Sequence, residues 1–275
     1  MKMLTDIHNH STFSFDGKNT LEDMLAAAQA KGVAFYGVSE HFDTDFFIYG
    51  MHKLRPDVTP TDAESYFHRA RHLQDDYAGV MNVLVGAELG YCNLSQVHEE
   101  YKQMLQTYKP DFIVNSVHNL HGEDYYMTTP YYRDGKLRDK DEVLDEYFRL
   151  VRDSLDVPYH YDIVGHVGYV TRYMPCEDKT VCLDTHKEIL TDILQTIIQK
   201  DKILEVNAAR DALLPQKDIL ALYYKLGGRK VSYGSDAHVA TNIMQRREKA
   251  VQMLKEIGFT HISVPCRGEH IAVEL

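Results

Sequence analysis

Metal-binding side chains recur along this chain at the ends of apolar, strand-like runs. His8 and His10 stand one residue apart in TDIHNH, and Asp236 and His238 repeat that spacing in GSDAH. Successive side chains of a strand point to opposite faces, so residues i and i+2 point the same way and can hold one ion together. Each pair therefore predicts a strand end that offers two metal ligands.

Other candidate ligands lie at or near the ends of further apolar, strand-like runs. His41 follows VAFYGVSE, Glu88 lies in VMNVLVGAELG, His118 ends DFIVNSVH and His166 lies in YDIVGHV. A single histidine at a strand end is usually an ordinary polar residue. The set is more informative, because six of the 15 histidines take equivalent places and two carboxylates join them. Asp16 is a further candidate: SFDG favours a turn, and the loop that carries it would cross the same region.

These ligands need a scaffold, and the apolar runs predict one made of parallel strands. Runs rich in Val, Ile and Tyr alternate with segments of helical period, which is typical of an α/β fold with crossover helices. The strand candidates are 2–10, 33–41, 80–90, 111–118, 161–167, 202–210 and 230–238, with a further short run at 260–265. In a (β/α) barrel the carboxyl ends of the strands open on one face, so distant ligands converge there. We therefore predict a metal site at that mouth.

Helices are expected between the strands. The clearest lies before the sixth strand, where apolar residues of 189–198 repeat on one face. Further helices are predicted at 62–76, 138–153 and 218–228. Segment 122–138 is the least regular and is expected to form a loop near the mouth. Because no Pro-rich or Ser-rich linker interrupts the pattern, residues 1–275 are predicted to form a single domain.

Charge and composition narrow the classes of partner. The formal net charge of -11 argues against a nucleic-acid binder, which normally presents a basic face. No stretch approaches the ~18 apolar residues of a membrane helix, and the first residues become charged too soon for a secretory signal. We therefore expect a cytoplasmic protein with no membrane partner. The four cysteines stand far apart and are predicted to be free thiols, and the sequence leaves the oligomeric state open.

The predicted ligand set indicates transition-metal chemistry. Mixed imidazole and carboxylate ligands suit Zn, Mn or Fe, and the lack of a cysteine cluster argues against a structural zinc. Nine candidates exceed the positions around one ion, and Glu88 can bridge two. Closely spaced ions can activate a hydroxide and stabilise a displacement at phosphorus. Three divalent ions set against Glu88, Asp236 and Asp16 leave an excess of about three positive charges, which favours a phosphate monoester over a neutral amide.

Two arginines stand where a phosphate would need them. Arg172 follows the fifth strand in HVGYVTRY, and Arg210 follows the sixth in EVNAAR. A guanidinium is a planar fork that can grip two phosphate oxygens, so both are predicted to bind the phosphate of the substrate. The alternative is a rim position without contact to substrate. The group that protonates the leaving alkoxide is less evident: Asp236 and His238 are the catalytic candidates, and both are also predicted ligands.

Six stretches in this order resemble the PHP (polymerase and histidinol phosphatase) family: DIHNHSTFSFDG, GVSEH, GAELG, SVH, DIVGHVGYVTRY and YGSDAH. The match runs over essentially the whole chain, and YYKLGGRKVSYGSDAH and LKEIGFTHISV resemble the histidinol-phosphate phosphatase branch. The resemblance implies a distorted seven-stranded (β/α) barrel of the TIM-barrel type with three divalent metal ions. It implies one ion on His8, His10, Glu88 and Asp236, a second on Glu88, His118 and His166, and a third on Asp16, His41 and His238.

The resemblance also implies an activity, which is hydrolysis of L-histidinol phosphate to L-histidinol and phosphate in histidine biosynthesis by a metal-bridging hydroxide. One alternative is a PHP phosphoesterase that acts on a sugar or nucleotide monophosphate or on an oligonucleotide. A second is a metal-dependent amidohydrolase, although the fourth strand carries NSVHN where that class usually has a bridging lysine. A third is a non-catalytic metal-binding module.

Overall fold

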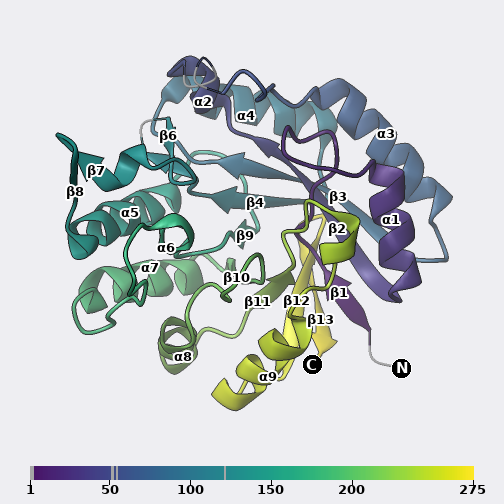
Figure 1. Ribbon diagram of the computed structural model, residues 1–275. Helices are drawn as coiled ribbons and strands as arrows, with labels where there is room; N and C mark the ends of the chain where they lie inside the picture. Colours follow the sequence, from purple (N-terminus) through teal and green to yellow (C-terminus); the bar gives the residue numbers. More distant parts are fainter. Residues whose placement is uncertain (1–2, 51–52, 54, 121) are drawn as a thin grey trace.

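The computed structural model describes residues 3–50, 53, 55–120 and 122–275, and its centre is a sheet of parallel strands (Figure 1). Within the described residues this sheet has seven strands, ordered β1-β2-β3-β4-β9-β10-β11. Their bounds are β1 Leu4–Asp6, β2 Val33–Phe42, β3 Asn82–Gly90, β4 Phe112–Ser116, β9 Ile163–Val164, β10 Ile203–Asn207 and β11 Val231–Gly234. All seven predicted strands are therefore present, in the order in which they occur in the sequence.

The two ends of the sheet meet and nearly close it into a barrel. The backbone N–H of Ile7 donates to the carbonyl of Tyr233 at 3.1 Å, and the N–H of Asp236 donates to the carbonyl of His8 at 2.8 Å. An isolated bridge joins Asn9 to Ala237. The predicted α/β barrel with seven strands is thus confirmed, and its distortion lies in the unequal strands, since β9 has 2 residues and β2 has 10.

Several strands end earlier than the sequence predicts. The first was expected to run from 2 to 10, but β1 ends at Asp6 and Lys2 lies outside the described residues. Similarly, β9 ends at Val164, before His166. The regular ladders stop at these points, although single backbone hydrogen bonds continue beyond them, such as His10 N–H to the carbonyl of Ala237 and Gly165 N–H to the carbonyl of Asn115. Candidate ligands therefore stand just beyond the strands as well as within them.

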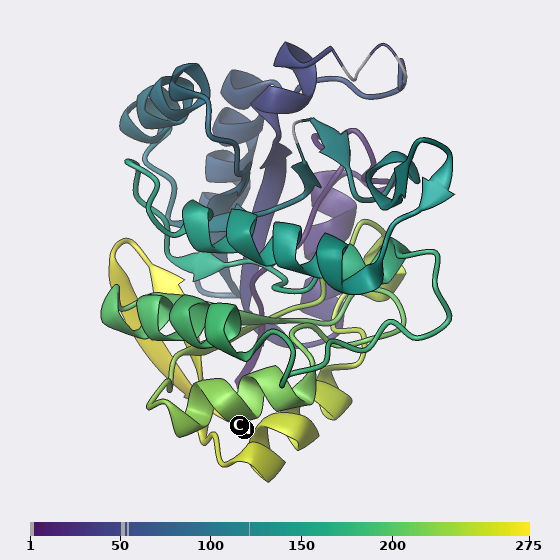
Figure 2. The same cartoon turned by 90° about the vertical axis from the view of Figure 1, so that its left-hand side faces the viewer.

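Helices surround the barrel and cover its outer face (Figures 1 and 2). Their bounds are α1 Leu21–Ala30, α2 Thr44–Ile48, α3 Ala63–Asp76, α4 Ser95–Tyr108, α5 Lys140–Ser154, α6 Val170–Tyr173, α7 Lys187–Gln199, α8 Lys217–Lys225 and α9 Arg247–Ile257, with 3₁₀ turns η2 Thr129–Tyr131 and η3 Ala240–Asn242. Figure 2 shows α5, α7, α8 and α9 as one layer in which successive helices pack together. In α7 the predicted apolar face is buried through Leu190, Ile193, Leu194 and Ile197. None of the helices in the described part of the chain is long and apolar enough to cross a membrane.

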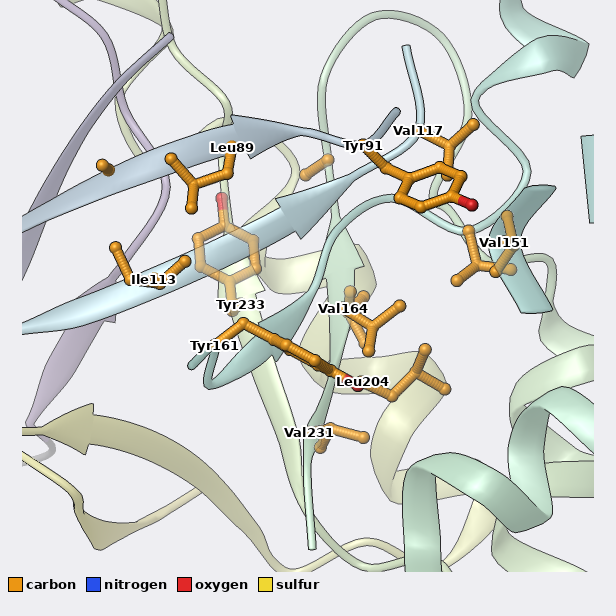
Figure 3. Packing of buried hydrophobic residues seen from close by; sticks show 14 of the residues in the cluster. Leu89, Tyr91, Ile113, Val117, Val151, Tyr161, Val164, Leu204, Val231 and Tyr233 are labelled. Carbon is orange, nitrogen blue, oxygen red and sulfur yellow. The ribbon is translucent and has the colours of Figure 1, made fainter. Parts of the chain in front are cut away.

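The main hydrophobic core lies between the barrel and these helices. Figure 3 shows Ile113, Val164, Leu204 and Val231, which come from four neighbouring strands, within this cluster. The strands are apolar on both faces because the inside of a (β/α) barrel is packed as well. A smaller interior cluster is built around Phe112. A Cβ at Gly86 would lie 2.4 Å from that ring, so a larger residue there would displace it.

A hairpin outside the barrel sheet closes the opposite end from the mouth. It consists of β12 (His261–Cys266) and β13 (Glu269–Glu274), and its Val264 and Val273 join the interior cluster. Arg267 ties it to Asp111, at the start of β4, through a bond of 2.8 Å from Nε to Oδ1. The predicted short strand at 260–265 is thus present, but it pairs with β13 and not with the barrel.

Segment 122–138 has little regular structure, as predicted. It contains β6 (Glu123–Asp124), which pairs with β5 (Asn119–Leu120), and a small hairpin of β7 (Tyr132–Arg133) and β8 (Lys136–Leu137). The four cysteines, Cys92, Cys176, Cys182 and Cys266, are free thiols, which also agrees with the sequence.

Candidate metal centre

All nine predicted ligands meet at the carboxyl-end mouth of the barrel, and Glu88 stands at their centre. Its side chain is 1% exposed. Glu88 Oε1 lies 2.9 Å from His166 Nε2 and 3.1 Å from His118 Nε2. Glu88 Oε2 lies 2.9 Å from His41 Nδ1 and 3.2 Å from His8 Nε2. Each carboxylate oxygen thus faces a different pair of imidazoles, which is the arrangement that a bridging ligand requires.

The remaining predicted ligands extend the cluster toward solvent. His10 Nε2 lies 3.4 Å from Asp236 Oδ1, and His238 Nε2 lies 3.1 Å from Asp16 Oδ2. His41 Nε2 is 3.3 Å from His238 Nε2 and 3.7 Å from Asp16 Oδ1. Imidazole nitrogens that face each other at this distance, next to a carboxylate, can hold a cation between them.

The donor atoms fit divalent metal ions. Four groups in the described residues have ligand atoms within 4.8 Å of one another: His8, His10 and Asp236; His10, His41 and His238; Glu88, His118 and His166; and His41, Asp43 and His118. Several of these buried atoms, including His8 Nε2, His10 Nε2 and Glu88 Oε2, make no hydrogen bond to the described residues. Buried polar atoms normally have hydrogen-bond partners. A cluster of buried ligand atoms without such partners therefore favours bound cations.

The charges of the cluster keep the carboxylates ionised. Burial raises the pKa of Glu88, but attraction to His8, His118 and His41 outweighs it and holds that pKa well below its usual value. The pKa of Asp236 is also held well below its usual value, because His8 and other nearby imidazoles outweigh the effect of burial. For His41 the sign is opposite: burial lowers its pKa, but Glu88 and Asp16 raise it to about 9. The site is thus a dense set of compensating charges.

His10 differs from its neighbours, and its pKa is held well below the usual value by burial and by repulsion from His41 and His238. A neutral imidazole is the form that binds a metal, so His10 needs to lose no proton at neutral pH. Between His8 and His10, Asn9 faces the barrel wall, where its Nδ2 donates to the carbonyl of Gly37 at 3.2 Å. The alternation of this segment therefore sends both imidazoles into the mouth.

The loop that carries Asp16 is held by a buried acid of β2. Glu40 accepts hydrogen bonds from the backbone N–H of Ser11 at 2.9 Å and from the hydroxyl of Ser14 at 2.5 Å. The loop turns tightly, since a Cβ at Gly17 would lie 1.9 Å from the carbonyl oxygen of Ser11. SFDG therefore forms a tight turn, as its sequence predicts, and this turn also places Asp16 beside His41.

The backbone at Asp236 adopts a conformation that few side chains favour. Its φ is 52°, in the left-handed region, where Asp and Asn are tolerated better than most residues. This turn allows Asp236 and His238 to face the cluster after β11 has ended. Non-glycine residues in this region often occur at functional sites.

Both predicted arginines lie at the same mouth. A cavity of about 450 Å³ is lined by ligands of the cluster and by Arg172 and Arg210. An Nη of Arg172 lies 3.3 Å from Asp236 Oδ2, and its other Nη donates to Asn207 Oδ1. Arg210 stacks over the ring of Tyr173 at 4.6 Å. Two guanidinium groups beside a cluster of metal-binding atoms form an environment that suits a phosphate group.

A second cavity of about 310 Å³ adjoins the first and is mostly apolar. His41 and His118 line both cavities, so the two meet at the cluster. Its other lining residues include Phe15, Phe46 and Met127. The site thus combines a compartment lined by metal-binding side chains and arginines with an adjoining, mostly apolar compartment that could hold an organic group.

Three acidic or amide residues of the site were missed by sequence reasoning. Asp43 Oδ1 lies 2.8 Å from His118 Nδ1, and Glu205 Oε1 lies 2.7 Å from His8 Nδ1. Asn207 Oδ1 accepts a hydrogen bond from Arg172. One signal was present: Glu205 and Asn207 stand two apart at the carboxyl end of the sixth strand, with the same spacing as His8 and His10.

Comparison with known proteins identifies relatives that span the chain. Residues 6–209 match the model of the PHP domain family. The histidinol-phosphatase of Lactococcus lactis subsp. lactis (strain IL1403) is 30% identical over 267 residues, which cover 96% of this chain and 94% of that protein. A probable histidinol-phosphatase of Clostridium acetobutylicum is 27% identical, over 91% of this chain and 92% of the relative.

Solved structures agree with this result. The crystal structure of histidinol phosphate phosphatase from Lactococcus lactis, in complex with zinc, L-histidinol and phosphate, superposes with a TM-score of 0.84. The two sequences are 27% identical, and the match covers 98% of each chain. A putative histidinol phosphatase from Listeria monocytogenes, at 19% identity and a TM-score of 0.73, shares the fold.

Proposed function

The chain belongs to the PHP domain family, and on that premise we propose that it hydrolyses L-histidinol phosphate to L-histidinol and phosphate with divalent metal ions. One observation carries the proposal: a cluster of metal-binding side chains and two arginines line one cavity, in a chain that aligns over 96% of its length with a histidinol-phosphatase. The reaction places this activity in histidine biosynthesis. The substrate is a small molecule.

The proposed ligands form three sets, which suggests three ions. They are His8, His10, Glu88 and Asp236; Glu88, His118 and His166; and Asp16, His41 and His238. The donors suit Zn, Mn or Fe, and zinc is bound in the related Lactococcus structure. Once bound by these residues, such ions would supply an activated water and would offset the charge of the phosphoryl oxygens.

The residues of the chain divide the remaining tasks. We assign the phosphate to Arg172 and Arg210, whose guanidinium groups line the larger cavity. The alcohol portion would extend into the adjoining apolar cavity beside His41 and His118. Asp236 and His238 line the same cavity, and Asp236 lies next to Arg172. We therefore assign to these two residues the control of proton delivery to the leaving alkoxide. Because both are also proposed ligands, that role is secondary to holding the ions.

We also propose that residues 1–275 act as one domain. The first and last barrel strands bond to each other, and the hairpin of β12 and β13 packs into the barrel interior. Residues from both ends of the sequence are therefore needed to complete the barrel and the ligand set.

The test is release of phosphate from L-histidinol phosphate by protein stripped of metals and reloaded with Zn, Mn or Fe. A panel of sugar and nucleotide monophosphates, a dinucleotide and an aryl phosphate is compared under the same conditions. We expect kcat/KM to be highest for L-histidinol phosphate. A higher value for another ester would overturn the substrate, and no release with any metal would overturn the activity itself.

A further inference from the structure

The sixth barrel strand, β10, is exceptional because no predicted metal ligand lies on it or directly after it. The other six strands of the described sheet each contain a predicted ligand or lead into one. Yet Glu205 and Asn207 of β10 point into the same mouth, and both are almost fully buried, at 1% and 0% exposure. Polar side chains this deeply buried need partners, so their contacts indicate what they do.

Glu205 holds His8 from the side opposite the cluster. Its Oε1 lies 2.7 Å from His8 Nδ1, and its Oε2 accepts from the backbone N–H of His166 at 2.6 Å. Since a carboxylate only accepts hydrogen bonds, His8 carries a proton on Nδ1, which leaves Nε2 directed at Glu88. Acids that hold the far nitrogen of a ligating histidine in this way set its orientation and tautomer.

The pair of Glu205 and His8 fits only because a glycine lies beside it. A Cβ at Gly234 would stand 2.4 Å from Glu205 Oε1 and 2.5 Å from His8 Cβ. A side chain at this position would therefore push the acid and the imidazole apart. The glycine of YGSDAH thus provides the space in which this contact forms.

Asn207 links the predicted phosphate-binding group to the predicted ligands. Its Oδ1 accepts from Arg172 and from the backbone N–H of Ala209. Its Nδ2 donates to Asp236 Oδ2 at 3.2 Å and to Glu205 Oε2 at 3.1 Å. Only an amide offers an acceptor to the guanidinium and donors to two carboxylates at once, so the residue type matches the position.

We propose that Glu205 and Asn207 are positioning residues with separate tasks: Glu205 presents His8 to a metal ion, and Asn207 holds Arg172 beside Asp236 to receive phosphate. This inference rests on the proposed function, because it assumes that the cluster binds metal and that Arg172 binds phosphate. Neither residue needs to touch the substrate. The competing explanation is that both only stabilise the fold.

The test separates metal binding from phosphate binding in the variants E205Q and N207A. Zn²⁺ affinity is measured by competition with a chromophoric chelator, and affinity for inorganic phosphate is measured by calorimetry at saturating Zn²⁺. We expect E205Q to weaken Zn²⁺ binding about 10- to 100-fold and to leave phosphate affinity unchanged. N207A should weaken phosphate binding about tenfold or more and should affect Zn²⁺ less than E205Q does.

The matched control is D111N, which alters a buried acid at the opposite end of the barrel. Asp111 is bonded to Arg71 at 2.7 Å and to Arg267 at 2.8 Å, so its loss should lower the melting temperature alone. The inference is overturned if E205Q and N207A behave like D111N, or if both lose the two affinities in equal proportion. If E205Q does not fold, N207A alone is the test: a greater loss of phosphate affinity than of Zn²⁺ affinity supports the inference, and equal losses overturn it. Wild-type protein that binds neither Zn²⁺ nor phosphate would instead refute the proposed function.

Discussion

Replacing Glu88 by Gln tests the charge balance of the cluster in metal-free protein. The side chain of Glu88 is 1% exposed. Its Oε1 lies 2.9 Å from His166 Nε2, and its Oε2 lies 2.9 Å from His41 Nδ1. The amide keeps the shape of the side chain but removes the negative charge. The protonated histidines around it would then be buried with less compensation, which costs about 3–5 kcal/mol when a buried pair is broken.

The lower end of that range applies here, because other acids contact the same histidines. Asp43 lies 2.8 Å from His118, and Glu205 lies 2.7 Å from His8. We therefore expect a loss of about 3 kcal/mol in the free energy of unfolding. For 275 residues at about 2.1 cal/mol/K each, the unfolding entropy is about 0.6 kcal/mol/K, so the melting temperature should fall by about 5 °C.

The loss should depend on pH with a definite sign. The pKa values of His8 and His118 are raised well above the usual value, and that of His41 is raised to about 9. Stability from these protonated histidines is fully present below their unfolded pKa of about 6.5 and disappears as pH rises through the folded values. The contribution of Glu88, whose folded pKa is lowered, is present above its unfolded pKa of about 4.3. The difference in the free energy of unfolding between wild type and E88Q should therefore be greatest at about pH 6.

Calorimetry of the chelator-treated proteins at about pH 6 and about pH 9.5 measures this difference. We expect the deficit of E88Q to be smaller at the higher pH, where His41, whose pKa is raised to about 9, has lost most of its charge. The control is again D111N, because Asp111 pairs with arginines that keep their charge at both values. A deficit of E88Q that is equal at both pH values, or absent at about pH 6, would show that Glu88 does not stabilise the fold by balancing protonated histidines.

Three further predictions concern the substrate, a packing constraint and a single ion. Arg172→Met and Arg210→Met should each lower kcat/KM for the phosphate ester about 10- to 100-fold, which corresponds to the loss of a charged hydrogen bond. The control Arg229→Met removes a guanidinium that stacks on Tyr224 and should leave the steady-state rates unchanged. Gly90→Ala would place a Cβ 1.9 Å from Asp43 Oδ1, so we expect a loss of about 1–3 kcal/mol in a denaturant titration; an unaltered midpoint would contradict that contact. Asp16→Asn should lower the metal content per chain by one ion in elemental analysis, and an unchanged content would remove Asp16 from the ligand set.

The sequence was sufficient to predict the strands and the face on which the ligands meet. Buried parallel strands are continuous apolar runs, and a residue directly after such a run lies at the carboxyl end, so His118 and His166 could be placed without any contact being known. The spacing of His8 and His10 also indicated a common direction. These inferences depend on local pattern, which a single sequence contains.

Features that depend on distant contacts were not predictable in the same way. Glu205 resembles any polar residue within a strand, and its partner His8 lies 197 positions away. Asp43 is the single residue between β2 and α2, and only the fold brings it to His118. The pairing of β12 with β13 was missed because the exposed pattern of 269–274 lacks a clear apolar face. Partner choice in each case is set by tertiary packing.

Metal-dependent hydrolysis is tested by measuring the rate of L-histidinol phosphate hydrolysis against the number of metal ions bound per chain. Metal-free protein is titrated with Zn²⁺ or Mn²⁺, and metal content and phosphate release are determined on the same samples. We predict no turnover without metal and full turnover only when more than one ion is bound, because Glu88 faces imidazoles with both oxygens. Full turnover by metal-free protein would exclude metal-dependent hydrolysis, and full turnover with a single ion would exclude a bridging role for Glu88.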